Sequence, residues 1–207
     1  MKKILLCPFF GDMPIWIDKF QFPNGYEYII DTNLELFKKR VKDKLGIDYP
    51  GIYGSGKVWD YRPALGLLYE EEIKGYDYWL TCDFDMVFGD VDKWFTDEQL
   101  NELDIWSNHH SYVCGCWTLY RNCKKVNELF MRYDNWKEMM IYPEANGWVE
   151  KEYSRLLEES ELSYRYSFYQ GNPYTTEPKL KKEGNRLYQD EEEIAMFHFR
   201  RSKIFPL

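Results

Sequence analysis

The stretch that decides the fold is Tyr78–Asp90, with the sequence YWLTCDFDMVFGD. Its aromatic and apolar beginning is typical of a buried strand, which we expect to span residues 76–82. Asp83 and Asp85 follow directly, and because they are one residue apart on an extended backbone, their side chains point to the same side. Ligands of α/β sheets gather beyond the carboxyl ends of the strands, so we expect the two carboxylates to meet at that edge.

The two carboxylates are candidate metal ligands. Carboxylate oxygens are hard ligands suited to Mg²⁺ or Mn²⁺, and one or two of them often hold such an ion while substrate phosphates complete its shell. A bare Asp-x-Asp pattern also occurs by chance, and the alternative interpretation is a solvated turn with two acids. The apolar residues at 84 and 86–88 favour the metal site, because unpaired acids in such surroundings need a cation.

Strands and helices alternate along the rest of the chain. Asn33 can cap a helix that Gly46 ends, and Pro63 stands in the first turn of another helix, where its missing N–H costs nothing. The expected strands span residues 3–9, 26–30, 76–82, 104–107, 112–120 and 194–199, and the expected helices span residues 34–45, 60–74, 126–140 and 149–158. This alternation predicts an α/β fold, and the length of 207 residues suits one domain over residues 1–207.

The composition argues against several classes of protein. With 27 Lys+Arg against 35 Asp+Glu the net charge is −8, whereas a general nucleic-acid-binding protein would be basic. The 13 Phe, 8 Trp and 18 Tyr argue against disorder, and such rings gather where a polar ligand with apolar faces is held. The sequence shows neither a run of about 18 apolar residues, as a membrane span needs, nor a cleavage signal near its N-terminus.

The five cysteines are odd in number and fall inside expected strands or beside a helix. They therefore fit reduced thiols in a cytoplasmic protein better than a disulfide framework. His109, His110, Cys114 and Cys116 admit a zinc site, but structural zinc sites pair cysteines as C-x₂₋₄-C and no second C-x-x-C is present. Small buried cysteines beside Gly115 are the better explanation.

A second candidate region is the segment 197–203, FHFRRSK. The neutral imidazole of His198 can complete the shell of a divalent metal. Arg200, Arg201 and Lys203 form a positive cluster that would balance a diphosphate in an otherwise acidic protein. The alternative interpretation is a solvated basic tail with a half-buried histidine.

Several stretches across nearly the whole chain carry a resemblance to known proteins. They are Pro8–Pro14, Asp60–Gly66, Gly75–Trp79, Cys82–Asp85, Phe88–Asp90, Thr118–Asn122, Tyr153–Ser154 and the His198 segment. The chain resembles a GT-A glycosyltransferase, and most closely an uncharacterised bacterial family of glycosyltransferase-like proteins linked to cell-surface polysaccharide synthesis. The resemblance implies a Rossmann-like fold with a mixed, mostly parallel central sheet flanked by helices. It also implies a metal-dependent transfer of sugar from a nucleotide-diphosphate sugar to a saccharide acceptor.

The resemblance implies roles residue by residue. Asp83 and Asp85 would lie at the metal and at the ribose and diphosphate of the nucleotide sugar, and His198 would be a further metal ligand. Further implied contacts to the nucleotide sugar are Phe9, Phe10 and Gly11 near the nucleobase. Asp60 and Arg62 would lie near the base, ribose or donor sugar, and Cys114 and Gly115 would belong to the segment that lines the sugar pocket. Arg200, Arg201 and Lys203 would lie at the diphosphate. Lys203 lies five residues after His198, where many retaining relatives have a lysine at six.

A carboxylate base on the acceptor hydroxyl is needed if the transfer inverts the sugar. The candidates are Glu150 and Glu152, and the alternative interpretation is that both are ordinary acids on a helix surface. The related pattern has an Asp-Glu pair here, of which the first position is Val149 in this chain. Retention and inversion both remain open.

The expected cofactors are Mn²⁺ or Mg²⁺ and a nucleotide-diphosphate sugar, with a UDP-sugar as donor, and the expected partner is a saccharide acceptor rather than nucleic acid. A lipid-linked acceptor would bring this cytoplasmic enzyme to the inner face of the membrane through a peripheral contact. Two alternatives stay open: a nucleotide-sugar hydrolase that uses the same metal site with water as acceptor, and a carbohydrate-binding module without catalysis. The sequence does not indicate an oligomeric state.

The aromatic residues divide into an expected core majority and a few candidates for stacking on sugars. Trp79 and Trp94 are expected in the core. The candidates for sugar faces fall in expected loops or near the motifs, and they are Trp16, Trp59, Trp117, Trp148 and Tyr169.

Overall fold

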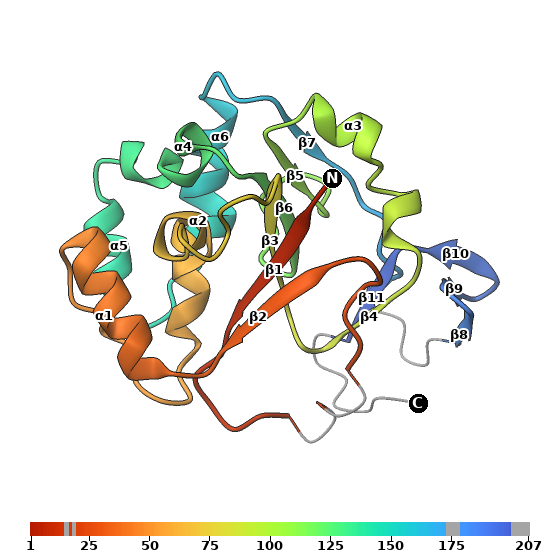
Figure 1. Ribbon diagram of the computed structural model, residues 1–207, viewed down its shortest axis with the longest axis horizontal. Coiled ribbons are helices and arrows are strands. Elements are labelled where there is room, and N and C mark those ends of the chain that lie inside the picture. Colours follow the sequence, from red (N-terminus) through yellow and green to blue (C-terminus); the bar gives the residue numbers. More distant parts are fainter. Residues whose placement is uncertain (15–16, 18–19, 173–178, 200–207) are drawn as a thin grey trace.

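A mixed six-stranded sheet forms the centre of the computed structural model, which describes residues 1–14, 17, 20–172 and 179–199 (Figure 1). Its strands lie in the order β2 (Glu27–Asp31), β1 (Lys3–Pro8), β3 (Tyr78–Cys82), β6 (Trp117–Arg121), β5 (Ile105–Ser107) and β7 (Tyr164–Tyr166). Strand β6 runs antiparallel to both of its neighbours, whereas β1 pairs in parallel with β2 and β3, and β5 pairs in parallel with β7. The mixed, mostly parallel sheet flanked by helices is therefore confirmed.

Helices cover one face of this sheet, on the left in Figure 1. They are α1 (Leu34–Leu45), η2 (Gly56–Ala64), α2 (Leu65–Leu68), α4 (Lys124–Asn127), η4 (Leu129–Arg132), α5 (Trp136–Ile141), η5 (Val149–Tyr153) and α6 (Ser154–Glu158). Among the described residues, every helix is too short or too polar to cross a membrane.

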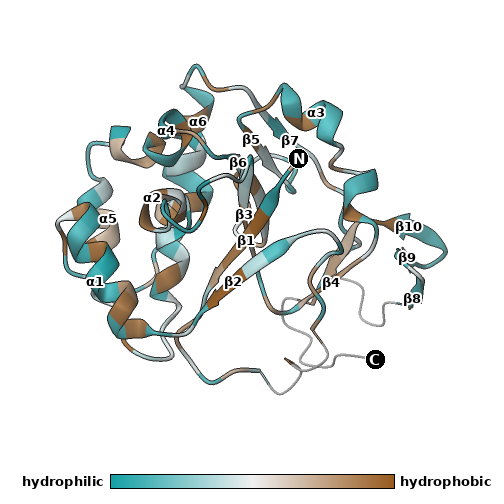
Figure 2. Ribbon diagram, viewed as in Figure 1, coloured by the Kyte–Doolittle hydropathy of each residue, from teal (hydrophilic) through white to brown (hydrophobic). Residues whose placement is uncertain are grey.

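Short elements cover the other face of the sheet. They are β4 (Met86–Phe88), η3 (Val91–Lys93), α3 (Asp97–Asn101), β8 (Leu180–Glu183), β9 (Arg186–Gln189), β10 (Glu192–Ile194) and β11 (Met196–His198). Residues alternate between the two faces, so that Ile4 and Leu6 of β1 pack under the helices while Leu5 and Cys7 pack under the short elements. Figure 2 shows β1 hydrophobic over most of its length and the peripheral α3 and β10 mainly hydrophilic.

Helix α1 forms where the sequence predicts it, because both of its ends carry local signals. The Asn33 side chain accepts a hydrogen bond from the Leu36 N–H at 3.0 Å, which satisfies one of the free donors of the first turn. Gly46 ends the helix with φ of 69°, a left-handed conformation that glycine adopts without a steric penalty. Between them Phe37 and Val41 are buried against the sheet.

The expected helix over residues 60–74 is wrong, since residues 56–64 form the 3₁₀ helix η2 and α2 ends at Leu68. Pro63 lies inside η2 rather than in a first turn, and it has no N–H to donate to the Asp60 carbonyl. The indole N–H of Trp148 donates to that carbonyl instead, at 2.9 Å. A tertiary hydrogen bond thus replaces the local one that the proline removes.

Three other expected elements are interrupted. The expected helix over residues 126–140 is divided into α4, η4 and α5, with Tyr133 extended between the last two. The expected strand over residues 112–120 begins only at Trp117, because the Cys114 N–H donates to Ser107 Oγ and its carbonyl accepts from Thr118 Oγ1, both at 2.7 Å. The expected last strand is divided at Ala195, whose N–H donates to the Tyr169 carbonyl.

The last described strand, β11, pairs with β4 and not with the central sheet. The pairing is antiparallel, with His198 opposite Met86, and the Phe199 N–H donates to the Asp85 carbonyl at 2.8 Å. Because β4 follows the two acids directly, its pairing with β11 places His198 close to the end of β3, although the two are far apart in the sequence.

Candidate functional site

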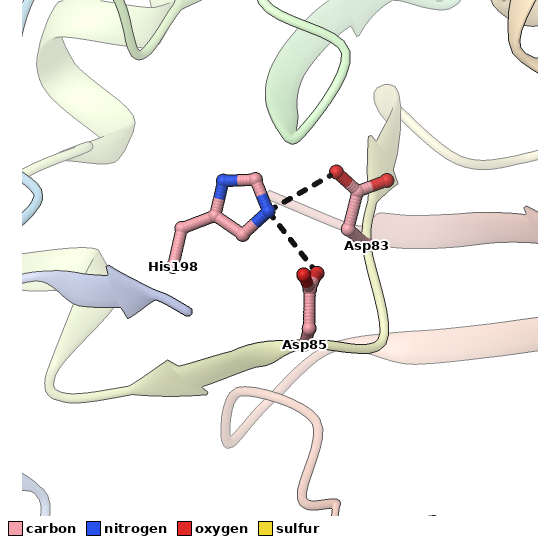
Figure 3. Close-up of side chains that lie close together, drawn as sticks. All are labelled: Asp83, Asp85 and His198. Atoms are coloured by element: carbon pink, nitrogen blue, oxygen red, sulfur yellow. Dashed lines mark ion pairs between the residues drawn. The ribbon is translucent and has the colours of Figure 1, made fainter. Parts of the chain in front are cut away.

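Asp83, Asp85 and His198 converge beyond the carboxyl end of β3 (Figure 3). The His198 Nε2 atom lies 3.1 Å from Asp85 Oδ1 and 3.5 Å from Asp83 Oδ2. The one ligand atom that each of the three residues offers lies within 4.8 Å of the others. All three side chains are partly buried, with exposed fractions of 25%, 28% and 12% in that order. The convergence expected from the sequence is therefore present in the structure.

The electrostatics of this cluster suit a cation. Burial alone would lower the pKa of His198, but the hydrogen bond to Asp85 and the charges of both acids outweigh it and raise the pKa above its usual value. His198 Nδ1 is buried and has no hydrogen-bond partner among the described residues. Two carboxylates and one imidazole form a donor set that Mn²⁺ or Mg²⁺ accepts, so the residues present fit the expected metal.

Arg62 contacts the cluster of Asp83, Asp85 and His198 through Asp83. Its Nη2 atom forms an ion pair with Asp83 Oδ1, and Asp83 outweighs the effect of burial and holds the pKa of Arg62 above its usual value. Gly115 leaves room for this guanidinium, because a Cβ atom at position 115 would overlap Arg62 Nη1. Arg62 thus brings a fixed positive charge next to the two acids.

The cluster lies in a cleft with a volume of about 730 Å³. The ends of β1 and β3, the helix η2, the turn 114–116, the segment 145–150 and His198 line this cleft. Among the predicted catalytic, nucleotide-sugar-binding and metal-binding residues, those that line the cleft are Phe9, Asp60, Arg62, Asp83, Asp85, Cys114, Gly115, Glu150 and His198. The fold therefore brings most of the candidate residues to one concave surface.

Other candidate residues lie elsewhere. Phe10, expected near the nucleobase, is buried in the helical core, with its ring centroid 4.9 Å from that of Phe37. Gly11 is next to the cleft but does not line it. Glu152 lines a separate cavity on the helical side, where it pairs with Arg155 at 3.0 Å, so the structure separates it from Glu150. Arg200, Arg201 and Lys203 fall outside the described residues.

Asp60 lines the cleft but its carboxylate is used inside the protein, which the sequence did not indicate. Its exposed fraction is 1%, and Lys57, which is fully buried, donates to Asp60 Oδ2 at 2.9 Å. The backbone N–H groups of Asn146 and Gly147 donate to the same carboxylate at 3.1 and 3.2 Å. Lys57 also donates to the carbonyls of Met139 and Glu144, so this buried ion pair fixes the segment that forms one wall of the cleft.

Four of the five cysteines line the cleft, and all five are free thiols. Cys7 and Cys82, at the ends of the neighbouring strands β1 and β3, have their Sγ atoms 3.4 Å apart, and Cys114 and Cys116 lie beside them in the cleft lining. Burial raises the pKa of Cys82 well above its usual value, which keeps this thiol protonated. Cys114 and Cys116 are buried, as expected, and the candidate metal group of the described residues consists of the two acids and His198.

The candidates for sugar faces separate into buried and exposed rings. Trp117 and Trp148 are buried in the core, so the prediction that they face a sugar is wrong. The Tyr169 ring packs against the rings of Trp94 and Trp106. Trp59 is 54% exposed and lines the cleft. Trp16 lies outside the described residues.

We expect Trp117→Ala to lower the free energy of unfolding by about 3–5 kcal/mol, because it leaves a large cavity among Tyr26, Phe88 and Phe95. Urea denaturation followed by circular dichroism measures this loss. Trp59→Ala is the matched control, since it removes an exposed ring and should change stability by less than about 1 kcal/mol. Equal effects of the two substitutions would contradict the assignment of Trp117 to the core.

Comparison with known proteins places the chain in a family. Residues 7–205 match the family described as Family of unknown function (DUF6625). The chain belongs to this family. No curated protein matches the sequence.

Solved structures identify the fold of this DUF6625 member. One similar structure is described as "crystal structure of a glycosyltransferase involved in the glycosylation of the major capsid of PBCV-1". The similarity covers 98% of this chain and 96% of that chain, with a TM-score of 0.58 and 12% sequence identity. A197 from STIV is 14% identical over 94% of both chains, with a TM-score of 0.43. The first likeness confirms the expected glycosyltransferase-like fold.

Proposed function

We propose that this protein is a metal-dependent glycosyltransferase that moves a sugar from a nucleotide-diphosphate sugar to a saccharide acceptor. The observation that carries the proposal is the cluster of Asp83, Asp85 and His198 inside a cleft at the carboxyl end of β3. The glycosyltransferase-like fold supports it, because the ligands of such sheets bind at that edge. In this proposal residues 1–207 form one transferase domain.

Asp83, Asp85 and His198 would hold Mn²⁺ or Mg²⁺, which stabilises the negative charge that develops on a departing nucleoside diphosphate. Arg62 supplies further positive charge beside Asp83. Phe9, Cys114 and Gly115 then border the donor, and Gly115 keeps the space that Arg62 occupies. Glu150 is the candidate base for an inverting reaction, since its exposed side chain lines the same cleft.

The biological setting belongs to the same proposal. A UDP-sugar as donor and a role in cell-surface polysaccharide synthesis, at the cytoplasmic face of a membrane through peripheral contact, follow from the sequence resemblance. Arg200, Arg201 and Lys203 would add charge at the diphosphate.

Calorimetry with the wild-type protein tests the proposal. UDP, GDP and CDP are titrated with and without Mn²⁺, and UMP serves as the control that lacks the second phosphate. We expect at least one diphosphate to bind about 100-fold more tightly with Mn²⁺ than without it, and UMP to bind weakly under both conditions, because a metal held by Asp83 and Asp85 would supply the positive charge that a diphosphate requires. Failure of all three diphosphates to bind with Mn²⁺ would overturn the proposal.

Product analysis separates transfer from the hydrolase alternative. The nucleotide sugar that matches the preferred diphosphate is incubated with Mn²⁺, with and without a panel of saccharide acceptors. A transferase forms a new glycoside only when an acceptor is present, whereas release of free sugar at the same rate in both reactions would identify a hydrolase.

A further inference from the structure

The helix η2 presents three rows of side chains, because a 3₁₀ helix has three residues per turn and residues three apart eclipse one another. One row contains Lys57 and Asp60 and is buried against the segment 139–147. A second row contains Val58, Tyr61 and Ala64, which are buried in the core. The third row begins at Gly56 and continues through Trp59 and Arg62, both of which line the cleft. Such a long 3₁₀ segment is unusual, and it turns a complete row of side chains toward the cleft.

The two cleft-facing side chains of this row lie at different depths. The Arg62 side chain has an exposed fraction of 15% and pairs with Asp83, so it marks the metal end of the cleft. Trp59 lies one turn earlier, ~6 Å back along the helix axis, and is 54% exposed. The cleft therefore runs from the acidic cluster to an open indole ring.

Packing against the helix itself positions the Trp59 ring. A Cβ atom at Gly56 would lie 2.6 Å from Trp59 Cζ3, so the ring covers a position where only glycine leaves room. Trp59 makes no ring contact with another aromatic side chain of the described residues. By contrast, Trp79, Trp106 and Trp117 are fully buried, so among the described tryptophans an indole that lines a cleft and stays exposed is the exception.

The wall that carries Trp59 also carries the candidate base. Helices η2 and η5 pack on each other, and Glu150 of η5 and Gly147 beside it line the cleft together with Trp59. An indole face and a carboxylate that line the same cleft are together suited to a pyranose ring, because the apolar C–H face of the sugar can cover the indole while its hydroxyl groups donate to the carboxylate. A base acts only within hydrogen-bond reach of the acceptor hydroxyl, so the wall with Glu150 is the acceptor side.

From this arrangement we infer that Trp59 is the platform on which the acceptor binds, and that the acceptor presents a pyranose ring with an apolar C–H face to the indole. The inference rests on the proposed function, which it deepens by assigning the acceptor end of the cleft. Trp59 sets acceptor affinity and selectivity, while the nucleotide is held at the other end of the same row by Arg62 and the acidic cluster.

The test measures saccharide and nucleotide binding separately. The probes are the methyl glycosides of glucose, galactose, mannose and rhamnose, whose contact with the protein is measured by saturation-transfer-difference NMR with Mg²⁺ and the diphosphate that calorimetry selects. We expect Trp59→Ala to weaken glycoside binding at least about 10-fold, Trp59→Phe to retain most of it, and neither to change the diphosphate affinity more than about twofold. Ile52→Ala, which removes a 73% exposed side chain outside the cleft lining, is the control and should change neither affinity.

Each other outcome decides against one of the two proposals. Unchanged glycoside binding in Trp59→Ala, or no glycoside contact with the wild-type protein, overturns the acceptor platform and leaves the transferase proposal standing. A loss of diphosphate affinity in Trp59→Ala assigns the ring to the donor nucleotide and also overturns the platform. If no diphosphate binds to the wild-type protein, the transferase proposal fails, and Trp59-dependent glycoside binding would then identify a saccharide-binding site alone.

Discussion

Asp85→Asn is expected to remove metal-dependent nucleotide binding, with a loss of affinity of at least about 100-fold. Asp85 is the acid nearest to His198, and the substitution replaces the charged side chain of a proposed metal ligand with a neutral amide of the same size. Changes that only reorient metal ligands already lower metal affinity by about 10–100-fold, so loss of a ligand charge should exceed that range. Calorimetry with the preferred nucleoside diphosphate and Mn²⁺ measures the effect.

The control for this experiment is Asp43→Asn, which removes an equal charge from the surface of α1, where Asp43 pairs with Lys39. Asp85 is a better choice than Asp83, because removing Asp83 would also leave the Arg62 guanidinium without its partner. Thermal unfolding of both variants shows whether they remain folded. Undiminished binding by a folded Asp85→Asn protein would mean that the acidic cluster is not the metal site.

The parts of the fold that the sequence predicts correctly are those with strong local signals. Helix α1 has a capping asparagine at one end and a glycine at the other, and both act in the structure as the sequence indicates. Strand β3 is a short apolar run that ends at the two acids, and its burial leaves little choice of conformation. The pairing of His198 with these acids followed from the resemblance, because no local signal connects residues that are more than 100 positions apart.

Features that depend on tertiary contacts could not be predicted from local sequence signals. The spacing of apolar residues over 60–74 indicates an α-helix, but η2 is held by the Trp148 indole and by the bonds of Lys57, which come from segments about 80 residues away. The burial of Trp117 likewise depends on rings from distant parts of the chain. The resemblance implied that Asp60 lies near the base, ribose or donor sugar, and only the structure shows that its carboxylate accepts hydrogen bonds from backbone N–H groups in the wall of the cleft.

Lys57→Met is expected to lower the free energy of unfolding by about 3–5 kcal/mol, because it leaves the Asp60 carboxylate buried without its cation. The methionine fills a similar volume, so the loss reports the missing charge and hydrogen bonds more than a cavity. The carbonyls of Met139 and Glu144 also lose their donor. Urea denaturation followed by circular dichroism gives the value.

The matched control is Lys38→Met, since Lys38 and Glu35 form an ion pair with the same three-residue spacing but on the exposed surface of α1. This substitution should change the free energy of unfolding by less than about 1 kcal/mol. Adding Asp60→Asn to Lys57→Met should recover about 1 kcal/mol or more, because the neutral amide no longer buries an unpaired charge, and its single oxygen still accepts from one of the two N–H groups, of Asn146 or Gly147, that the carboxylate binds with its two oxygens. Equal losses in the two lysine variants would show that the buried pair does not stabilise the wall of the cleft.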